Sequence, residues 1–321
     1  MTNERELLKP KRLRPGDTIG VISPASPSER PSDVPRSKSY LEEMGFHVVV
    51  GRNVNRRKGI VAASEKERAD DLNEMFSRPD IDAVFVTQGG YGSAQIIDKI
   101  DFDNIRTHPK IFTGFSDITS LHLAINKFAR IVTFHSCGMT RFSREIMTEY
   151  TKTQFLKAVM VPQPLGDIEL ADPRKWLYPI SPGIAEGELI GGNLSLLCAG
   201  MGTPYQPDLD GKILFLEEVD TEPWIVDNSM SHLRNCGVLN RLCGVVVGEF
   251  KNCVPNEYKP GYLSDLHVEE VLEYYLQPLG IPVLYGLPLG HTDNMAALPL
   301  GVRVRLDCDQ KRLTVLESGV I

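Results

Sequence analysis

The 321-residue chain lacks long apolar runs and an excess of basic residues, and each absence excludes a class of protein. No apolar stretch approaches the length of about 18 residues that a transmembrane helix requires. The formal net charge is −7, whereas general nucleic-acid binding requires a basic surface. We therefore expect neither a membrane nor a nucleic acid among the partners.

Paired cysteines are also missing. The six cysteines, at positions 137, 198, 236, 243, 253 and 308, are scattered and form no C-x-x-C pair. This pattern predicts buried thiols in a reducing compartment, with no disulfide framework and no zinc site. The segment from Met1 to Arg14 is charged and has no apolar core, so it does not predict a secretory signal. We expect a cytoplasmic protein with neither a metal site nor a cofactor.

Strands and helices alternate along the first half of the chain. Apolar patterns predict strands at 17–23, 46–50, 81–87, 110–115 and 129–134, with helices at 36–44, 64–76 and 93–99. Ser64 and Glu67 form the sequence signature of a capping box at the second helix. This alternation predicts a parallel sheet, whose ligand crevice lies beyond the carboxyl ends of its strands.

The pattern changes after about residue 150. Five prolines fall between residues 160 and 185, which indicates a linker or a crossover. Beyond them, strands are predicted at 186–190, 212–216 and 244–248, helices at 193–200, 226–236 and 268–277, and a terminal hairpin at 302–317. We predict an N-terminal α/β domain of residues 1–160, a linker of residues 161–185 and a mixed C-terminal domain of residues 186–321.

Ser116 stands between a predicted strand and a predicted helix. A serine at such a turn can present its hydroxyl to a ligand beside the unpaired N–H groups of the helix start. Serine is also a favoured N-cap, and on this stretch alone the cap is the favoured interpretation. The turn reads Gly-x-Ser-x-Ile, so it lacks the second glycine of the Gly-x-Ser-x-Gly elbow.

A nucleophilic serine requires a base, and the chain contains seven histidines. His291 follows the apolar run 281–289 on a glycine-flanked loop, where it can face a cleft. His135 ends a strand and could line the crevice, whereas His122 is expected to face outward from the helix after Ser116. For each of them a solvated side chain remains the alternative.

The base in turn requires a carboxylate that orients it. Glu217 and Glu218 end the apolar strand that begins near Lys212, and strand alternation sends their side chains to opposite sides. One of them can therefore share a pocket with a histidine, while the alternative is a surface pair of acids. A glycosidase with two paired carboxylates is weakly supported, because no matching second acid is marked elsewhere.

The glycines at 89–92 follow a predicted strand end. Their spacing does not match a phosphate-binding loop. They can instead bring a backbone N–H close to a reacting carbonyl, as the second donor of an oxyanion hole. The chain thus contains a nucleophile, an acid, a base and donors, in the order Ser, Glu, His.

Six segments together resemble the LD-carboxypeptidase family, which includes murein tetrapeptide carboxypeptidases and microcin C resistance peptidases. They are GDTIGVISPASP, GGYG, KIFTGFSDITSLHLA, GELIGGNLSLL, GKILFLEEVDTEPWIVD and GLPLGHTDN, in the family's order. The resemblance spans nearly the whole chain. It implies an N-terminal flavodoxin-like domain, a smaller β-rich C-terminal domain, and a serine peptidase that commonly forms a homodimer.

The resemblance also implies roles for individual residues. Ser116 matches the nucleophile, Glu217 the orienting acid and His291 the base. The backbone N–H groups of Gly90 and Asp117 match the oxyanion hole. Three further residues are expected to contact the substrate: Gly89, Tyr91 and Asn193.

Three positions depart from the family pattern and bear on the substrate. Gln88 replaces an arginine that is usual in members with murein activity, and Trp224 replaces a common tyrosine. The loop usually written His-Gly-Pro reads His135-Ser136-Cys137-Gly138. We expect these residues near the substrate groove.

The resemblance implies an L,D-carboxypeptidase that hydrolyses an amide bond in a murein-type peptide through an acyl-enzyme. A peptidyl-nucleotide of the microcin C type is the alternative substrate for the same chemistry. A non-catalytic two-domain protein that closes on a peptide or a sugar is the alternative from another class.

Overall fold

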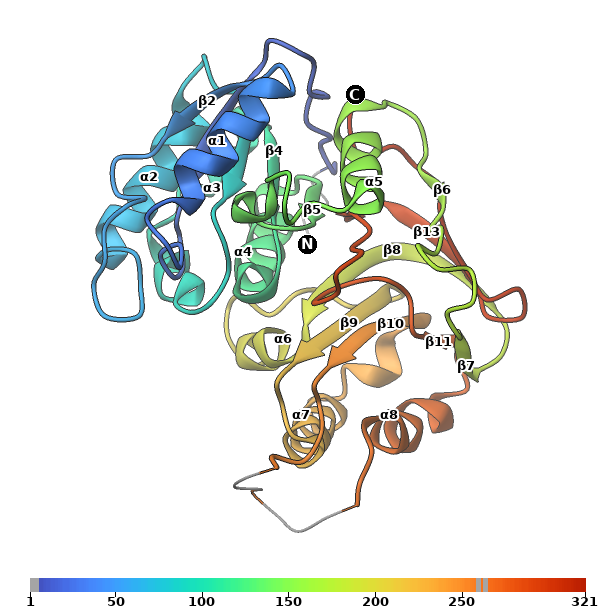
Figure 1. Cartoon of the computed structure of the whole chain (residues 1–321). Coiled ribbons are helices and arrows are strands. Elements are labelled where there is room, and N and C mark those ends of the chain that lie inside the picture. The colour runs from blue at the N-terminus through green and yellow to red at the C-terminus, as the bar shows by residue number, and fades with distance from the viewer. Residues whose placement is uncertain (1–5, 258–260, 262–264) are drawn as a thin grey trace. The chain divides into compact units, whose positions relative to one another are not determined.

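The computed structural model describes residues 6–257, 261 and 265–321, and they form two compact units (Figure 1). The first unit contains Met1–Gln163, Ala297–Gly301 and Ser318–Ile321, and the second contains Pro164–Ala296 and Val302–Glu317. Two short segments from the C-terminal part of the chain therefore belong to the first unit. The sequence patterns did not indicate that the chain returns to the first unit at these two segments.

The first unit contains a six-stranded sheet in the order β12-β5-β4-β3-β1-β2. Five strands run parallel, and β12 pairs antiparallel with β5 at one edge. The order β2-β1-β3-β4-β5 is that of flavodoxin-like folds, which confirms the expected architecture. The strands are β1 (Thr18–Ile22), β2 (His47–Val50), β3 (Ala83–Val86), β4 (Ile111–Gly114), β5 (Thr133–His135) and β12 (Leu298–Leu300).

Helices connect the successive parallel strands of this unit. They are α1 (Asp33–Glu43), α2 (Glu65–Ser77), α3 (Phe102–Thr107) and α4 (Thr119–Ala124), while α5 (Glu149–Met160) follows the last parallel strand, β5. The capping box of α2 is confirmed, with the Ser64 N–H donating to Glu67 Oε2 at 3.0 Å and the Ser64 Oγ accepting from the Glu67 N–H. The helix expected at 93–99 is a 3₁₀ helix, and α5 was not predicted.

The second unit contains an eight-stranded mixed sheet in the order β6-β14-β13-β8-β9-β10-β11-β7. Four central strands, β8 to β11, run parallel, so their carboxyl ends share one edge. The expected terminal hairpin is β13 with β14. The strands are β6 (Gly166–Asp167), β7 (Tyr178–Ser181), β8 (Ile184–Asn193), β9 (Ile213–Val219), β10 (Gly244–Lys251), β11 (Val283–Tyr285), β13 (Arg303–Asp307) and β14 (Arg312–Val315).

The proline-rich segment 161–185 contains β6 and β7, the two edge strands of this sheet, where a linker was expected. Proline has no N–H to donate, so within a sheet it is tolerated mainly at edges. Pro179 lies in β7 at such an edge. The prolines therefore mark the border of a sheet.

Three helices belong to the second unit: α6 (Leu194–Gly200), α7 (Pro223–Asn235) and α8 (Val268–Leu276). Helices α7 and α8 pack against each other on one side of the sheet (Figure 1). The apolar residues of β9 and β10 are almost fully buried and form the core of the unit. Within the described part of the chain, no helix combines the length and the apolar character that crossing a bilayer demands.

Candidate active site

Ser116 follows β4 in a backbone conformation that is rare for a side chain of its kind. Its φ is +62°, in the left-handed region, where residues other than glycine are strained. Phe115 and Ile118 are the N-cap residues of the 3₁₀ turn Ser116–Ile118 and of α4. The interpretation of Ser116 as an N-cap is therefore wrong. A strained serine between a strand and a helix is instead typical of a nucleophile elbow.

Ser93 holds Asp117, the residue after Ser116, through both its carboxylate and its carbonyl. The Ser93 N–H donates to Asp117 Oδ2 at 2.7 Å, and the Ser93 Oγ donates to the Asp117 carbonyl at 2.5 Å. Burial raises the pKa of the Asp117 carboxyl, and the hydrogen bond from Ser93 opposes that shift. These two bonds restrain Asp117, whose backbone N–H is the expected oxyanion donor.

The glycine loop passes directly beside this turn. A Cβ placed on Gly89 would lie 2.9 Å from the Ser116 Cβ and 3.2 Å from the Asp117 nitrogen. A side chain at position 89 would therefore displace the nucleophile turn. The structure thus brings together Gly89, Ser116 and Asp117.

Ser26 holds the peptides on both sides of Gly90. The Ser26 N–H donates to the Gly89 carbonyl at 3.2 Å, and the Ser26 Oγ accepts from the Tyr91 N–H at 3.1 Å. In a trans peptide the C=O and the N–H point in opposite directions. The contact to the Gly89 carbonyl therefore aims the Gly90 N–H away from Ser26. Gly90 is exposed, and its φ of +97° suits glycine.

Arg68 is a buried cation that the sequence analysis missed. Its side chain is 1% exposed, and its Nη1 donates to the carbonyls of Pro24 and Gly92, both at 2.6 Å. It therefore ties the loop before Ser26 to the glycine loop, and burial lowers the pKa of its guanidinium. The sequence contained a signal of this burial, because the helical spacing places Arg68 on the same face of α2 as the apolar residues Leu72 and Phe76, which are buried.

His122 is buried below the serine turn, so the expectation that it faces outward is wrong. Its Nε2 donates to the Gly114 carbonyl at 2.9 Å, and burial lowers its pKa to about 4. Every residue of α4 is buried, which leaves this helix no outward face. His135 is also fully buried, with its ring centroid 6.3 Å from that of His122. It therefore packs in the core and does not line an open crevice.

Glu217 and His291 are hydrogen-bonded within the second unit. Glu217 Oε2 accepts from His291 Nδ1 at 2.6 Å and from the His291 backbone N–H at 3.3 Å. Glu217 is fully buried, while the His291 side chain is 18% exposed. Because Nδ1 donates to the carboxylate, Nε2 of the neutral ring is left as the basic nitrogen. A carboxylate thus orients the imidazole, as a general base requires.

A bulge in β10 supports the loop that carries His291. The register between β9 and β10 shifts between Val247 and Phe250, and there the Glu249 N–H donates to the Leu289 carbonyl at 3.0 Å. Bulges commonly redirect a strand next to a functional site. Here the hydrogen bond from the bulge holds the loop 289–292 at the carboxyl end of β10, beside Glu217 of β9.

Glu218 points to the other side of β9, as strand alternation predicts. Its carboxylate accepts from Asn193 Nδ2 at 2.7 Å and from the Ser195 N–H and Oγ at 2.9 and 2.6 Å. Asn193 is 3% exposed and caps α6 by accepting from the Leu196 N–H. The second glutamate therefore holds the start of α6. A substrate contact from Asn193 remains a prediction.

The positions that depart from the family pattern differ in their surroundings. Ser136 and Cys137 are buried in the core of the first unit. The Gln88 Nε2 donates to the Pro27 carbonyl at 2.8 Å. Trp224, in the first turn of α7, is 37% exposed, and Tyr91 of the glycine loop is 52% exposed. The two aromatic side chains are therefore the ones among these that can contact a ligand directly.

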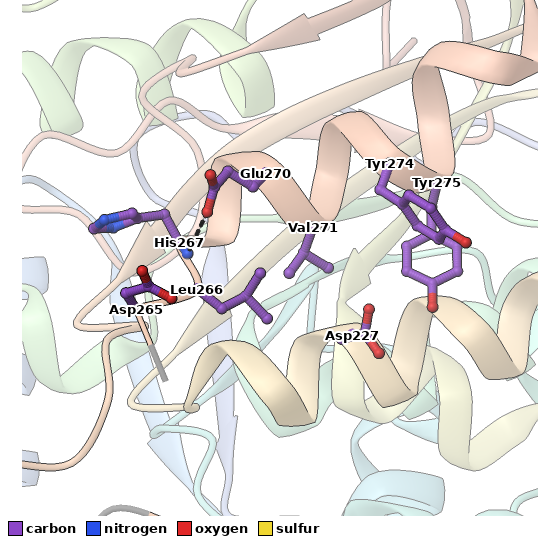
Figure 2. Close-up of a pocket in the computed structure, with 8 residues that line it drawn as sticks. All are labelled: Asp227, Asp265, Leu266, His267, Glu270, Val271, Tyr274 and Tyr275. Carbon is purple, nitrogen blue, oxygen red and sulfur yellow. Dashed lines mark hydrogen bonds between the residues drawn. The ribbon is translucent and has the colours of Figure 1, made fainter. Parts of the chain in front are cut away.

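A cavity of about 920 Å³ lies between α7 and α8 (Figure 2). Asp227 lines it from α7, and residues 265–267 with Glu270, Val271, Tyr274 and Tyr275 line it from the other side. The His267 N–H donates to Glu270 at 2.9 Å, so these two residues are engaged in the start of α8. The cavity includes none of the predicted site residues. In residues 6–257, 261 and 265–321, no group of three His, Cys, Asp or Glu side chains is placed to hold a metal ion.

Each unit thus contains groups of the kind that serine hydrolases use. The first holds a serine on a strained turn beside a glycine loop, and the second holds a buried carboxylate bonded to a histidine. These features define the class of protein as a hydrolase with a nucleophilic serine.

Comparisons with known proteins identify the family within this class. The model of the LD-carboxypeptidase N-terminal domain matches residues 19–136, and that of the C-terminal domain matches residues 186–306. The chain is 39% identical to the probable murein peptide carboxypeptidase of Bacillus subtilis (strain 168), over 97% of this chain and 95% of that protein. The chain therefore belongs to the LD-carboxypeptidase family and is a serine peptidase.

Solved structures agree with this assignment. The microcin C7 self-immunity protein MccF, in complex with aspartyl sulfamoyl adenosine, superposes with a TM-score of 0.88 at 27% identity, covering 98% of this chain and all of that one. The muramoyltetrapeptide carboxypeptidase from Oxalobacter formigenes superposes with a TM-score of 0.78 at 28% identity, covering 93% of this chain and 97% of that one. The two-domain fold is thus shared with both branches of the family.

Proposed function

We propose that the protein is an L,D-carboxypeptidase that hydrolyses the amide bond before the terminal residue of a murein-type peptide. Ser116 is the nucleophile, His291 the base and Glu217 the acid that orients it. The observation that carries the proposal is the 2.6 Å hydrogen bond between Glu217 Oε2 and His291 Nδ1. We further expect a homodimer located in the cytoplasm.

The mechanism follows from the chemistry of these groups. His291 Nε2 takes the proton of the Ser116 hydroxyl while the oxygen attacks the scissile carbonyl. The buried carboxylate of Glu217 stabilises the imidazolium that forms. His291 then protonates the leaving amine, which departs and leaves an acyl-enzyme. A water molecule, activated by His291, hydrolyses this ester and restores the serine.

The backbone N–H groups of Gly90 and Asp117 stabilise the oxyanion of each tetrahedral intermediate. A donor of this kind typically lowers the barrier by about 3 kcal/mol. The hydrogen bonds from Ser26 and Ser93 hold the two donors in place before substrate arrives. This preorganisation is what makes such donors effective, since they need not reorient during the reaction.

The murein peptide is the first candidate substrate because of the 39% identical relative from Bacillus subtilis. A peptidyl-nucleotide is the second, and the similarity to MccF bound to aspartyl sulfamoyl adenosine favours it. Both require the same acyl transfer. They differ in the leaving group, which is an amino acid in the first case and a nucleotide conjugate in the second.

The test is to incubate the purified protein with a murein tetrapeptide and, separately, with an aminoacyl-nucleotide, and to follow the released product by mass spectrometry. We expect Ser116→Ala to abolish turnover while the thermal unfolding midpoint is retained. Ser77→Ala, which removes a surface hydroxyl bonded to the Asn73 carbonyl, is the matched control and should keep full activity. Turnover at the wild-type rate in Ser116→Ala would reject the mechanism. Binding without any turnover in the wild type would favour the non-catalytic alternative.

A further inference from the structure

Lys251 is a cation at the same sheet edge as the acid and the base. It is the last residue of β10 and is paired in register with Val219, two residues beyond Glu217 on β9. Its Nζ lies 3.4 Å from Asp293 Oδ1, and Asp293 is two residues beyond His291. The ammonium group is thus attached to the loop that carries the base.

The ion pair of Lys251 with Asp293 is loose and open to solvent. The side chains are 42% and 87% exposed, and pairs of this kind contribute little to stability. Other lysines of this unit are held more firmly. Lys212 lies 2.6 Å from Glu188 with 12% of its side chain exposed, and Lys175 is bonded to Glu249. Lys251 can therefore exchange Asp293 for an anionic ligand at little cost.

The proposed reaction requires an anion next to His291. The leaving group of a carboxypeptidase is an amino acid whose carboxylate carbon is two bonds from the departing nitrogen. Because His291 must protonate that nitrogen, the carboxylate has to lie within a few bond lengths of the imidazole. A cation in the His291 loop or in an immediately neighbouring segment is within reach of that carboxylate, and Lys251 is such a cation.

The other charges at this edge make such a cation necessary. Glu217 is buried beside His291, and Asp293 lies in the His291 loop. Asp220, one residue beyond the end of β9, accepts from Asn252 Nδ2 at 3.0 Å. A substrate carboxylate would be repelled by all three groups unless a positive charge offset them.

We propose that Lys251 binds the terminal carboxylate of the leaving amino acid and so determines the specificity for a free C-terminus. This inference rests on the function proposed above. In the absence of substrate, Asp293 pairs with the Lys251 ammonium group, and it competes with the substrate carboxylate for this group. Lys251 is a specificity-determining residue and takes no part in proton transfer.

The experiment compares a murein tetrapeptide that ends in a free carboxylate with the same peptide ending in a carboxamide. The wild type should prefer the acid. In Lys251→Met, kcat/KM for the acid should fall by about tenfold or more, chiefly through KM, because a charge-assisted contact is lost. Turnover of the amide should stay within about twofold, since the amide carries no charge for the lysine to bind. Lys251→Arg should keep most of the preference for the acid.

Two further variants sharpen the result. Lys212→Met removes a lysine at the amino end of β9 and should leave the ratio of acid to amide turnover unchanged. Asp293→Asn removes the competing carboxylate and should lower KM for the acid without any change at Lys251. An unaltered ratio in Lys251→Met, or an unaltered KM in Asp293→Asn, would overturn the inference and leave the proposed function intact. A wild type that hydrolyses neither peptide would overturn the proposed function, and this inference with it.

Discussion

Gly290 and Glu217 are in such close contact that position 290 has no room for a side chain. A Cβ on Gly290 would lie 2.5 Å from both the Cβ and the Oε2 of Glu217, and the φ of Gly290 is +87°. The oxygen it would strike is the one that accepts from His291 Nδ1. The glycine before His291 is therefore what allows Glu217 and His291 to meet.

We accordingly expect Gly290→Ala to lower kcat by about 10²-fold or more, because the imidazole loses its orienting carboxylate. Steady-state kinetics on the hydrolysed peptide measure this loss. Gly280→Ala is the matched control, since Gly280 also has a positive φ, of +65°, but has no neighbouring atom within 4 Å of the added carbon. Both variants should lose about 1 kcal/mol of stability from backbone strain. An equal loss of activity in the two variants would contradict the proposed role of the contact.

Ser26→Ala tests the support of the glycine loop. The change removes the acceptor of the Tyr91 N–H and the donor to the Ile60 carbonyl, and leaves the backbone bond to Gly89 in place. The Gly90 N–H should become less well aimed, so we expect kcat to fall by about tenfold with little change in KM. Ser23→Ala is the control, because that hydroxyl lies 2.7 Å from the Thr87 Oγ1 and 3.4 Å from the Val54 carbonyl, and both partners are outside residues 89–92. A Ser26→Ala enzyme that loses no more kcat than Ser23→Ala would show that the hydroxyl does not aim the donor.

Glu218→Ala tests whether the second glutamate is structural. Without its carboxylate, the Asn193 Nδ2 and the Ser195 N–H lose their buried acceptor. We expect a loss of about 3 kcal/mol in the free energy of unfolding, measured with urea. Glu149→Ala, which removes a carboxylate that is 79% exposed and paired with Lys152, should change it by less than about 0.5 kcal/mol. Similar unfolding midpoints for the two variants would reject the structural role.

His122 should make the stability depend on pH. Its pKa is lowered from 6.5 to about 4 in the folded protein, so between these values the unfolded chain binds a proton that the native state does not. Stability from this group is therefore fully present above pH 6.5 and decreases as the pH falls toward 4, by about 3 kcal/mol in all. The check is denaturant unfolding at pH 7 and at pH 4.5. In His122→Gln, which can still donate to the Gly114 carbonyl, this part of the pH dependence should disappear. The exposed His47→Gln should retain it, and a His122→Gln profile parallel to the wild type would refute the assignment.

Local sequence patterns were sufficient for the strands of the first sheet and for the sides of β9 on which its two glutamates lie. Strand and helix periodicity predicted β1 to β5 in an α/β arrangement, and the capping box of α2 was visible in two residues. Strand alternation correctly separated Glu217 from Glu218. These properties depend on neighbours within a few positions of the chain, which is why they can be inferred without a structure.

The tertiary structure decided everything that depends on contacts distant in sequence. Glu217 meets His291 across 74 positions, and Arg68 reaches Pro24 across 44, so no local pattern specifies either pair. The left-handed φ of Ser116 and the burial of His122 occur where α4 packs against β5 and the adjacent turns, and this packing overrides the preference of serine for a cap and of histidine for the surface. Composition supplied the polar side chains, and packing determined which of them are buried and hydrogen-bonded.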